Sequence, residues 1–372
     1  MSSKNGIYLF TLIGLILGIS IDLLIRQNST HLFYYSFITL FCLLYALAYD
    51  GAHLLRLIGS SALTALVLSI PFLGVAELSF NPSLHFIIFC IAFPFCAYIA
   101  HAFHYAFHRD NTWRVNYSTL FEAVWTIIPL LIIASIFGSV VSGLLFLGAI
   151  IFKTVGNDYL WNLYLYNRDF SLISNTVFFF IGLGITQQNI QLIYNLRFLL
   201  LKMMFYLFPV LAIISVLYAV LYSINLVTGG QSTVEPLFIL IPLNALGIIF
   251  FNAYFQDGKA ETAYPQTLNI FLKIYRVCLF ILMLIMIYKI FKETAVEINL
   301  FIALLAVLFL SITYAITAFF SKEKETLWIC RGNIAAALFF LAALILLNLP
   351  YLAIEKNIAF IAPAPINAYP LF

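Results

Sequence analysis

The sequence predicts an all-α fold, a polytopic bundle of transmembrane helices with about eleven spans. Of its 372 residues, 64% are hydrophobic and only 9% are charged, against about a quarter in an ordinary soluble domain. Apolar runs recur along the chain at about the 20 residues with which a helix crosses a bilayer core of about 30 Å. The runs are continuous and not alternating, which favours helices over barrel strands. The lipid bilayer is therefore the expected partner.

The apolar runs place the spans at residues 7–25, 32–49, 55–75, 84–107, 119–152, 171–186, 196–226, 234–255, 268–290, 297–320 and 333–350. The run at 119–152 has room for two short helices or for one helix kinked near Pro129 or Gly138, and the run at 171–186 is short. The count therefore ranges from ten to twelve. The first run is too long for a signal-peptide core and lacks an A-x-A-type site, so a retained helix is expected.

We predict three parts: an N-terminal block of three helices over residues 1–83, a transmembrane core over 84–350, and a short C-terminal tail over 351–372. The tail is proline-broken and too short to fold alone. The loop at 153–169 is rich in Tyr and Trp, which usually lie at the level of the lipid headgroups. An interfacial helix is therefore expected in this loop.

The basic residues predict a cytoplasmic N-terminus, because Lys and Arg accumulate on the cytoplasmic side of a membrane. With the N-terminus inside, the inner segments hold twelve of them: Lys4, Arg56, Arg109, Arg114, Arg197, Lys202, Lys259, Lys273, Arg276, Lys322, Lys324 and Arg331. The outer segments hold six: Arg26, Lys153, Arg168, Lys289, Lys292 and Lys356. An odd number of spans then places the C-terminus outside.

The net charge of +3 is too small to indicate nucleic-acid binding, and no Lys/Arg cluster of the kind that grips phosphates is present. All five cysteines lie in or beside apolar runs without CxxC spacing: Cys42, Cys90, Cys96, Cys278 and Cys330. Disulfides and cysteine-bound zinc are therefore not expected.

The densest run of polar and ionisable residues is His101–Trp125, which we call the polar seam. It contains His101, His104, His108, Arg109 and Glu122, and it marks a water-facing junction between two blocks of spans. The histidines are spaced i, i+3 and i+7, so they share one helix face. Two readings remain open: a functional site, or histidines that line an aqueous interface or contact lipid headgroups.

A metal site in the polar seam is not expected. His101 and His108 are separated by roughly 10 Å along a helix axis, so all three histidines cannot bind one ion. His104 and His108 could supply two nitrogens, but the glutamate of an H-E-x-x-H box is absent. No cofactor is expected either, because no motif in the chain indicates one.

Few charges fall near the centre of a predicted span, and the remaining candidates for a structural role or a substrate path are mostly uncharged. The run at 234–255 contains Asn244 and Asn252, with Pro242 predicting a kink. Both asparagines fit helix packing or a broken-helix binding site. Asp257 ends this helix, where a carboxylate needs a counter-charge, and we expect it to pair with Arg276 or Lys273 of the next helix.

Four short motifs carry a family resemblance. They are Phe121-Glu122-Ala123-Val124-Trp125, Phe152-Lys153-Thr154-Val155-Gly156, Asn252-Ala253-Tyr254-Phe255-Gln256-Asp257-Gly258 and Arg331-Gly332-Asn333. In order and approximate spacing they resemble the uncharacterised bacterial membrane proteins grouped as the domain-of-unknown-function 4153 (DUF4153) family. The resemblance covers about residues 84–350 and implies a multi-pass protein of the bacterial inner membrane. It implies no catalytic residue, cofactor or substrate.

Three functions fit these observations. The first is a non-enzymatic protein with an envelope or scaffold-type role. The second is a solute transporter, which the number of helices and the kinked run at 234–255 favour. The third is a membrane enzyme acting on a lipid-linked substrate through the polar seam. An enzyme requires His104 or His108 to converge with Glu122 in a cleft, and a transporter requires a water-filled cavity reaching into the bundle.

Overall fold

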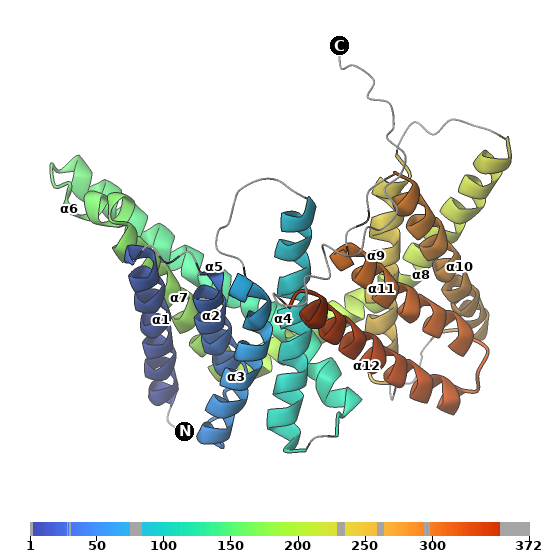
Figure 1. The fold of residues 1–372 in the computed structure, drawn as a ribbon, viewed down its shortest axis with the longest axis horizontal. Coiled ribbons are helices and arrows are strands. Elements are labelled where there is room, and N and C mark those ends of the chain that lie inside the picture. Colours follow the sequence, from blue (N-terminus) through green and yellow to red (C-terminus); the bar gives the residue numbers. More distant parts are fainter. Residues whose placement is uncertain are drawn as a thin grey trace, which may run out of the picture. The chain divides into compact units, whose positions relative to one another are not determined.

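A computed structural model of the chain describes residues 3–27, 29, 31–74, 84–112, 114–228, 235–258, 264–293, 296 and 298–349. In these ranges the regular secondary structure is helical throughout, without a strand (Figure 1). The long helices are α1 (Ser3–Arg26), α2 (Leu32–Leu47), α3 (Leu54–Ser69), α4 (Leu84–Asp110), α5 (Tyr117–Thr154), α7 (Arg168–Gln188), α8 (Ile190–Thr228), α9 (Leu237–Phe255), α10 (Gln266–Glu293), α11 (Ile298–Thr317) and α12 (Lys322–Leu347). The predicted all-α fold is confirmed.

Each predicted span corresponds to one long helix. In the described ranges, nine helices are long and apolar enough to cross a membrane, and α2 is apolar but only 16 residues long. Pro129 does not interrupt α5, which is one continuous helix of 38 residues. The number of spans and their orientation stay predictions.

Several boundaries differ from the predictions: α8, for example, begins at Ile190 and not at 196. α12 begins at Lys322, well before the predicted start at 333. Its first turn carries Glu323 and Glu325, which favour a helix N-terminus electrostatically although they lower hydropathy. The loop at 153–169 forms only a helical turn, α6 (Tyr159–Trp161), and a π-helical turn, η2 (Asn162–Tyr166). A short 3-10 helix, η1 (Ile70–Gly74), follows α3.

The chain divides into two compact units. Unit 1 comprises residues 1–80 and 97–198, and unit 2 comprises residues 81–96 and 199–372. The predicted N-terminal block of residues 1–83 thus lies mostly in unit 1, together with part of the predicted core. The predicted tail at 351–372 lies outside the described residues.

Unit 1 is built around α7, which packs against α1 and α5. Glycines allow these close contacts: a Cβ at Gly14 of α1 would lie 2.9 Å from Val177 Cα of α7. A Cβ at Gly182 of α7 would lie 2.8 Å from the Ala134 oxygen of α5. Small residues of this kind bring membrane helices together, because lipid tails are as apolar as the side chains and backbone packing must drive association.

Unit 2 is built around α10, which packs against α9 and α11, while α11 packs against α12. Its core is aromatic at one end, where Tyr275 and Tyr314 are fully buried among Phe208 and Phe251. A second, aliphatic cluster lies around Leu282.

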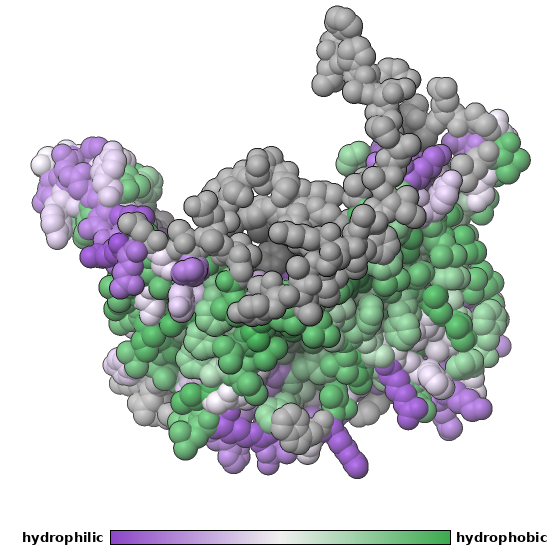
Figure 2. Space-filling model, in the orientation of Figure 1, coloured by the Kyte–Doolittle hydropathy of each residue, from purple (hydrophilic) through white to green (hydrophobic). Residues whose placement is uncertain are grey.

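The outer surfaces of the helices are apolar. Leu217 and Leu221 of α8 are 57% and 64% exposed, and Phe198 is 66% exposed. Figure 2 shows hydrophobic residues over the middle of the helices and hydrophilic residues gathered at helix ends. Side chains of this type face lipid in a membrane protein, because exposing them to water is unfavourable.

Candidate functional site

The polar seam folds as the end of α4, a turn and the start of α5. α4 ends at Asp110, and Asn111 follows with a φ of 54°, a left-handed backbone that asparagine tolerates better than most residues. Asn116 caps α5 by accepting a hydrogen bond from the Ser118 amide at 3.2 Å. One asparagine thus follows the end of α4 and the other caps the start of α5.

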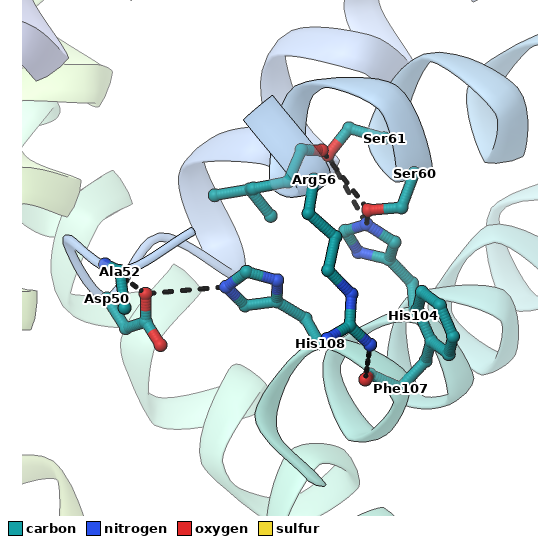
Figure 3. A network of polar contacts seen from close by, with 9 residues as sticks. Asp50, Ala52, Arg56, Ser60, Ser61, His104, Phe107 and His108 are labelled. Atoms are coloured by element: carbon teal, nitrogen blue, oxygen red, sulfur yellow. Dashed lines mark hydrogen bonds and ion pairs between the residues drawn. The ribbon is translucent and has the colours of Figure 1, made fainter. Parts of the chain in front are cut away.

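His101, His104 and His108 lie on one face of α4, which we call the histidine face. All three are buried, with no more than 5% of any of them exposed. This burial favours a packed position in the protein over the reading in which they line an aqueous interface or contact headgroups. α3 and the turn before it contact His104 and His108 of this face (Figure 3).

The partners of the histidine face come from the segment between α2 and the middle of α3. His104 Nε2 lies 3.0 Å from the Ser60 hydroxyl and 3.3 Å from the Ser61 hydroxyl. His108 Nε2 lies 3.3 Å from Asp50 Oδ1 in the turn before α3. Figure 3 shows the two rings reaching toward these groups. The histidine face is thus a polar contact between helices.

Arg56 of α3 completes this contact. Its Nη2 donates a hydrogen bond to the Phe107 carbonyl at 2.8 Å, and its guanidinium lies 4.4 Å from the centre of the Phe107 ring. Phe107 lies in the last turn of α4, where carbonyl groups lack partners within the helix and present negative charge. Arg56 therefore caps the end of α4 from a neighbouring helix.

Arg109 and Glu122 belong to a second cluster. Arg109 Nη1 donates to Glu122 Oε1 at 2.5 Å and to the Tyr105 hydroxyl at 2.7 Å. The hydroxyl of Tyr194 in α8 donates to the same Glu122 oxygen at 3.0 Å. Arg197 then donates to Thr126 of α5 at 3.0 Å. This cluster ties the ends of α4 and α5 to the start of α8.

His104 and Glu122 engage different partners. His104 contacts α3, whereas Glu122 contacts Arg109 and Tyr194. The two side chains therefore do not form the pair of catalytic groups that the enzyme hypothesis requires. Ser60 and His104 do form a serine–histidine pair. The amide groups around Ser60 are committed to the hydrogen bonds of α3, so they do not provide an oxyanion hole.

The partners of the histidine face were not predicted from the sequence. Ser60 and Ser61 are adjacent hydroxyls inside a predicted span, which is a signal that could have been used, since such groups need a partner in lipid. Asp50 and Arg56 gave no comparable signal, because each lies at the end of an apolar run where charge is ordinary.

Unit 2 contains a closed ring of hydrogen bonds among α9, α11 and α12. Asn252 donates to the Tyr314 hydroxyl at 2.9 Å, the hydroxyl donates to Asn333 Oδ1 at 2.7 Å, and Asn333 donates to Asn252 Oδ1 at 2.8 Å. We call these three residues the amide ring. It joins two of the motifs on which the family resemblance rests.

Arg276 of α10 lies beside the amide ring and is only 4% exposed. It donates to the Tyr314 carbonyl at 2.7 Å and to the Thr317 hydroxyl at 2.6 Å, and its Nη1 pairs with Glu325 of α12. The guanidinium also lies 4.9 Å from the centre of the Phe251 ring. The acid that pairs with Arg276 is thus Glu325, whereas the sequence predicts Asp257 as the partner of Arg276 or Lys273.

The remaining sequence candidates lie elsewhere in unit 2. Asn244 is 1% exposed; its amide donates to the Leu240 carbonyl at 2.8 Å and lies 3.8 Å from the Met286 sulfur. Asp257 follows the end of α9, beside Gly258 with its left-handed φ of 75°. Among the described residues, no group of three or more His, Cys, Asp or Glu side chains is placed to hold a metal ion.

Comparison of the chain with protein-family models, with curated proteins and with solved structures yields no match. The class of the protein therefore rests on the fold itself. Long apolar helices with exposed apolar side chains define an integral membrane protein of the multi-pass, all-α type.

Proposed function

We propose that the chain is a multi-pass protein of the bacterial inner membrane, related to the DUF4153 family, with a non-enzymatic envelope or scaffold-type role. The bacterial source and the inner membrane rest on the four motifs quoted above. One observation carries the non-enzymatic role: polar side chains of these motifs are bonded to neighbouring helices.

The amide ring is the main case. Tyr314 is fully buried, and its hydroxyl both accepts from Asn252 and donates to Asn333. A buried polar network of this kind stabilises one arrangement of helices only when its members satisfy one another. Each bond of the ring connects two different helices, so the ring supports a structural role for its members.

Glu122, from the first motif, follows the same pattern. It accepts hydrogen bonds from Arg109 of α4 and from Tyr194 of α8, so three helices meet at one carboxylate. A general acid or base needs at least one such group free to reach a substrate. The contacts of Glu122 support a role in holding helix ends together.

The proposal is tested by comparing stability with function. Asn252→Ala, Asn333→Ala and Tyr314→Phe are expressed in a strain lacking the chromosomal gene, and membrane abundance, thermal unfolding in detergent and rescue of the strain's envelope defects are measured. Ser223→Ala is the matched control, because Ser223 is exposed and, among the described residues, its hydroxyl bonds to the Ala219 carbonyl of its own helix.

For a scaffold, rescue should fall in proportion to the amount of folded protein. The control should match the wild type in all three measurements. A ring variant with wild-type abundance and melting but no rescue would contradict the proposal, because the side chain would then contribute something other than helix packing.

A transporter is the second candidate. The buried, ionisable histidine face favours it, since ionisable groups inside membrane proteins often mark ion paths. Pro242 and Asn244 in α9 also fit a helix that adapts around a solute. The same experiment separates the two functions: Asn244→Ala with normal melting and lost rescue would support transport.

A further inference from the structure

Glu122 belongs to a cluster with Arg109, Thr126, Tyr194 and Arg197, which we call the arginine cluster. Arg197 of α8 is half-buried, and its Nη1 donates to the Thr126 hydroxyl of α5 at 3.0 Å. Its guanidinium lies 5.1 Å from the centre of the Tyr194 ring. These are its contacts among the described residues, and neither a hydroxyl nor an aromatic ring carries a full negative charge. A guanidinium has five N–H donors, so most of those of Arg197 are left for another partner.

Two further arginines among the described residues are not exposed, and both are better compensated. Arg276 is paired with Glu325. Arg56 bonds to the Phe107 carbonyl, at the end of α4 where the helix presents negative charge. A charge held away from water without a partner is unfavourable. The surroundings of Arg197 therefore fit an anion that comes from outside the described chain.

The other charges of the arginine cluster leave an excess of positive charge. Arg109 and Glu122 form an ion pair, so together they are neutral. Asp110, the other acid at this end of α4, accepts a hydrogen bond from a threonine of α5 at 3.0 Å and is not among the partners of Arg197. Tyr194 contacts the neutral pair through its hydroxyl and Arg197 through its ring. The charge of Arg197 is therefore the uncompensated one.

The arginine cluster lies beside a surface that faces lipid. Leu192 and Phe198, on either side of the cluster along α8, are 52% and 66% exposed, as expected of side chains that contact acyl chains. Arg109 is in the last turn of α4, and Glu122 is in the second turn of α5. The ends of spanning helices reach the lipid headgroups, and basic pockets between such helices bind anionic headgroups.

We propose that Arg197, held by Thr126 and Tyr194, binds the phosphate of an anionic phospholipid. The planar guanidinium offers parallel N–H groups that match two phosphate oxygens, and the acyl chains lie against the apolar surface at Phe198. A net negative lipid fits better than a zwitterionic one, because the excess charge is positive and Glu122 is already paired. Phosphates occupy both surfaces of a bilayer, so the proposal does not depend on orientation. It holds for a scaffold or a transporter.

The test measures how strongly lipid stabilises the full-length protein in detergent. Its melting temperature is followed as dioleoyl-phosphatidylglycerol, dioleoyl-phosphatidylcholine or inorganic phosphate is added, because a ligand of the folded state raises it. Phosphatidylglycerol should give the largest rise. Arg197→Gln should weaken the apparent affinity for phosphatidylglycerol by about fivefold or more, the scale of one basic residue at an anionic membrane surface.

Two further variants separate binding from folding. Arg114→Gln removes an exposed arginine from the segment between α4 and α5, and it should change the affinity by less than about twofold because exposed charges are screened. Glu122→Gln keeps an oxygen for Arg109 and Tyr194 but removes a negative charge from the cluster. It should therefore raise the affinity by about fivefold, a gain that a damaged fold cannot produce.

Three results would overturn the proposal. The first is equal affinity for phosphatidylglycerol in the wild type and in Arg197→Gln. The second is an equal response to phosphatidylglycerol and phosphatidylcholine, and the third is an equal response to inorganic phosphate, which would make the occupant a soluble anion. If Arg197→Gln does not fold, Glu122→Gln decides the question, because unchanged affinity in this variant would also contradict the proposal.

Discussion

Asn333 of α12 donates a hydrogen bond to Asn252 of α9 at 2.8 Å, across 81 residues of sequence. The two asparagines belong to separate motifs of the family resemblance, and Tyr314 of α11 closes the ring between them. In this contact each amide is satisfied by the other, in a setting that offers little water.

The amide ring should behave as one unit. Removing either asparagine leaves a buried partner unsatisfied, so Asn252→Ala and Asn333→Ala should each lower the free energy of unfolding by about 1–3 kcal/mol. The double variant should lose less than the sum of the two. Thermal or denaturant unfolding in detergent measures this cycle, and strictly additive losses would show that the asparagines do not interact.

Glu325 should matter more than its neighbour Glu323. Arg276 is 4% exposed and pairs with Glu325, so Glu325→Ala leaves a buried charge unpaired and should cost about 3–5 kcal/mol. Glu323 is an exposed acid in the same first turn of α12, and Glu323→Ala should cost less than about 1 kcal/mol.

Asp257→Ala, measured beside these two variants, tests the pairing predicted from the sequence. A loss equal to that of Glu325→Ala, together with coupling to Arg276→Ala or Lys273→Ala, would make Asp257 a further partner of these cations. A small loss without coupling would leave Glu325 as the acid on which Arg276 depends.

A side chain at Gly14 should destabilise the contact between α1 and α7. A Cβ there would lie 2.9 Å from Val177 Cα, a backbone atom that cannot move alone, so Gly14→Ala should destabilise unit 1 by about 1–3 kcal/mol. Gly143 of α5 has no atom within 4 Å of such a Cβ. Gly143→Ala should be neutral or stabilising by up to about 1 kcal/mol, because alanine favours the helix.

The C-terminus is expected on the periplasmic side. This follows from the twelve-to-six distribution of basic residues and an odd number of spans. An alkaline phosphatase fused after Phe372 should be active, and a reporter that works only in the cytoplasm should be inactive. The reverse pattern would require an even number of spans.

The purified protein is expected to carry no stoichiometric transition metal. Two imidazoles of the histidine face already contact Ser60, Ser61 and Asp50, and two histidines from one helix supply too few ligands for zinc. Elemental analysis measures the content. About one zinc per chain, lost in a His104→Ala, His108→Ala double variant, would reverse this view.

The sequence by itself determined the fold class and the position of nearly every long helix. Hydrophobicity and length are local properties of the sequence, and the thickness of the bilayer sets how many apolar residues a spanning helix needs. α12 shows where this reasoning stops: its first turns, from Lys322, are helical but too polar to count as part of an apolar run. The sequence also identified the histidine face as one face, because helical periodicity alone sets it.

Only the tertiary structure decided which groups meet. Asp50 and His108 are 58 residues apart, and Arg276 and Glu325 are 49 apart. Such pairs depend on which helices are neighbours and how each is rotated about its axis. Hydropathy does not indicate this, because lipid-facing and helix-facing surfaces are both apolar. Asp257 was the nearer acid in sequence, yet the acid that reaches Arg276 comes from α12, because the packing of α10, α11 and α12 brings Glu325 to the buried guanidinium.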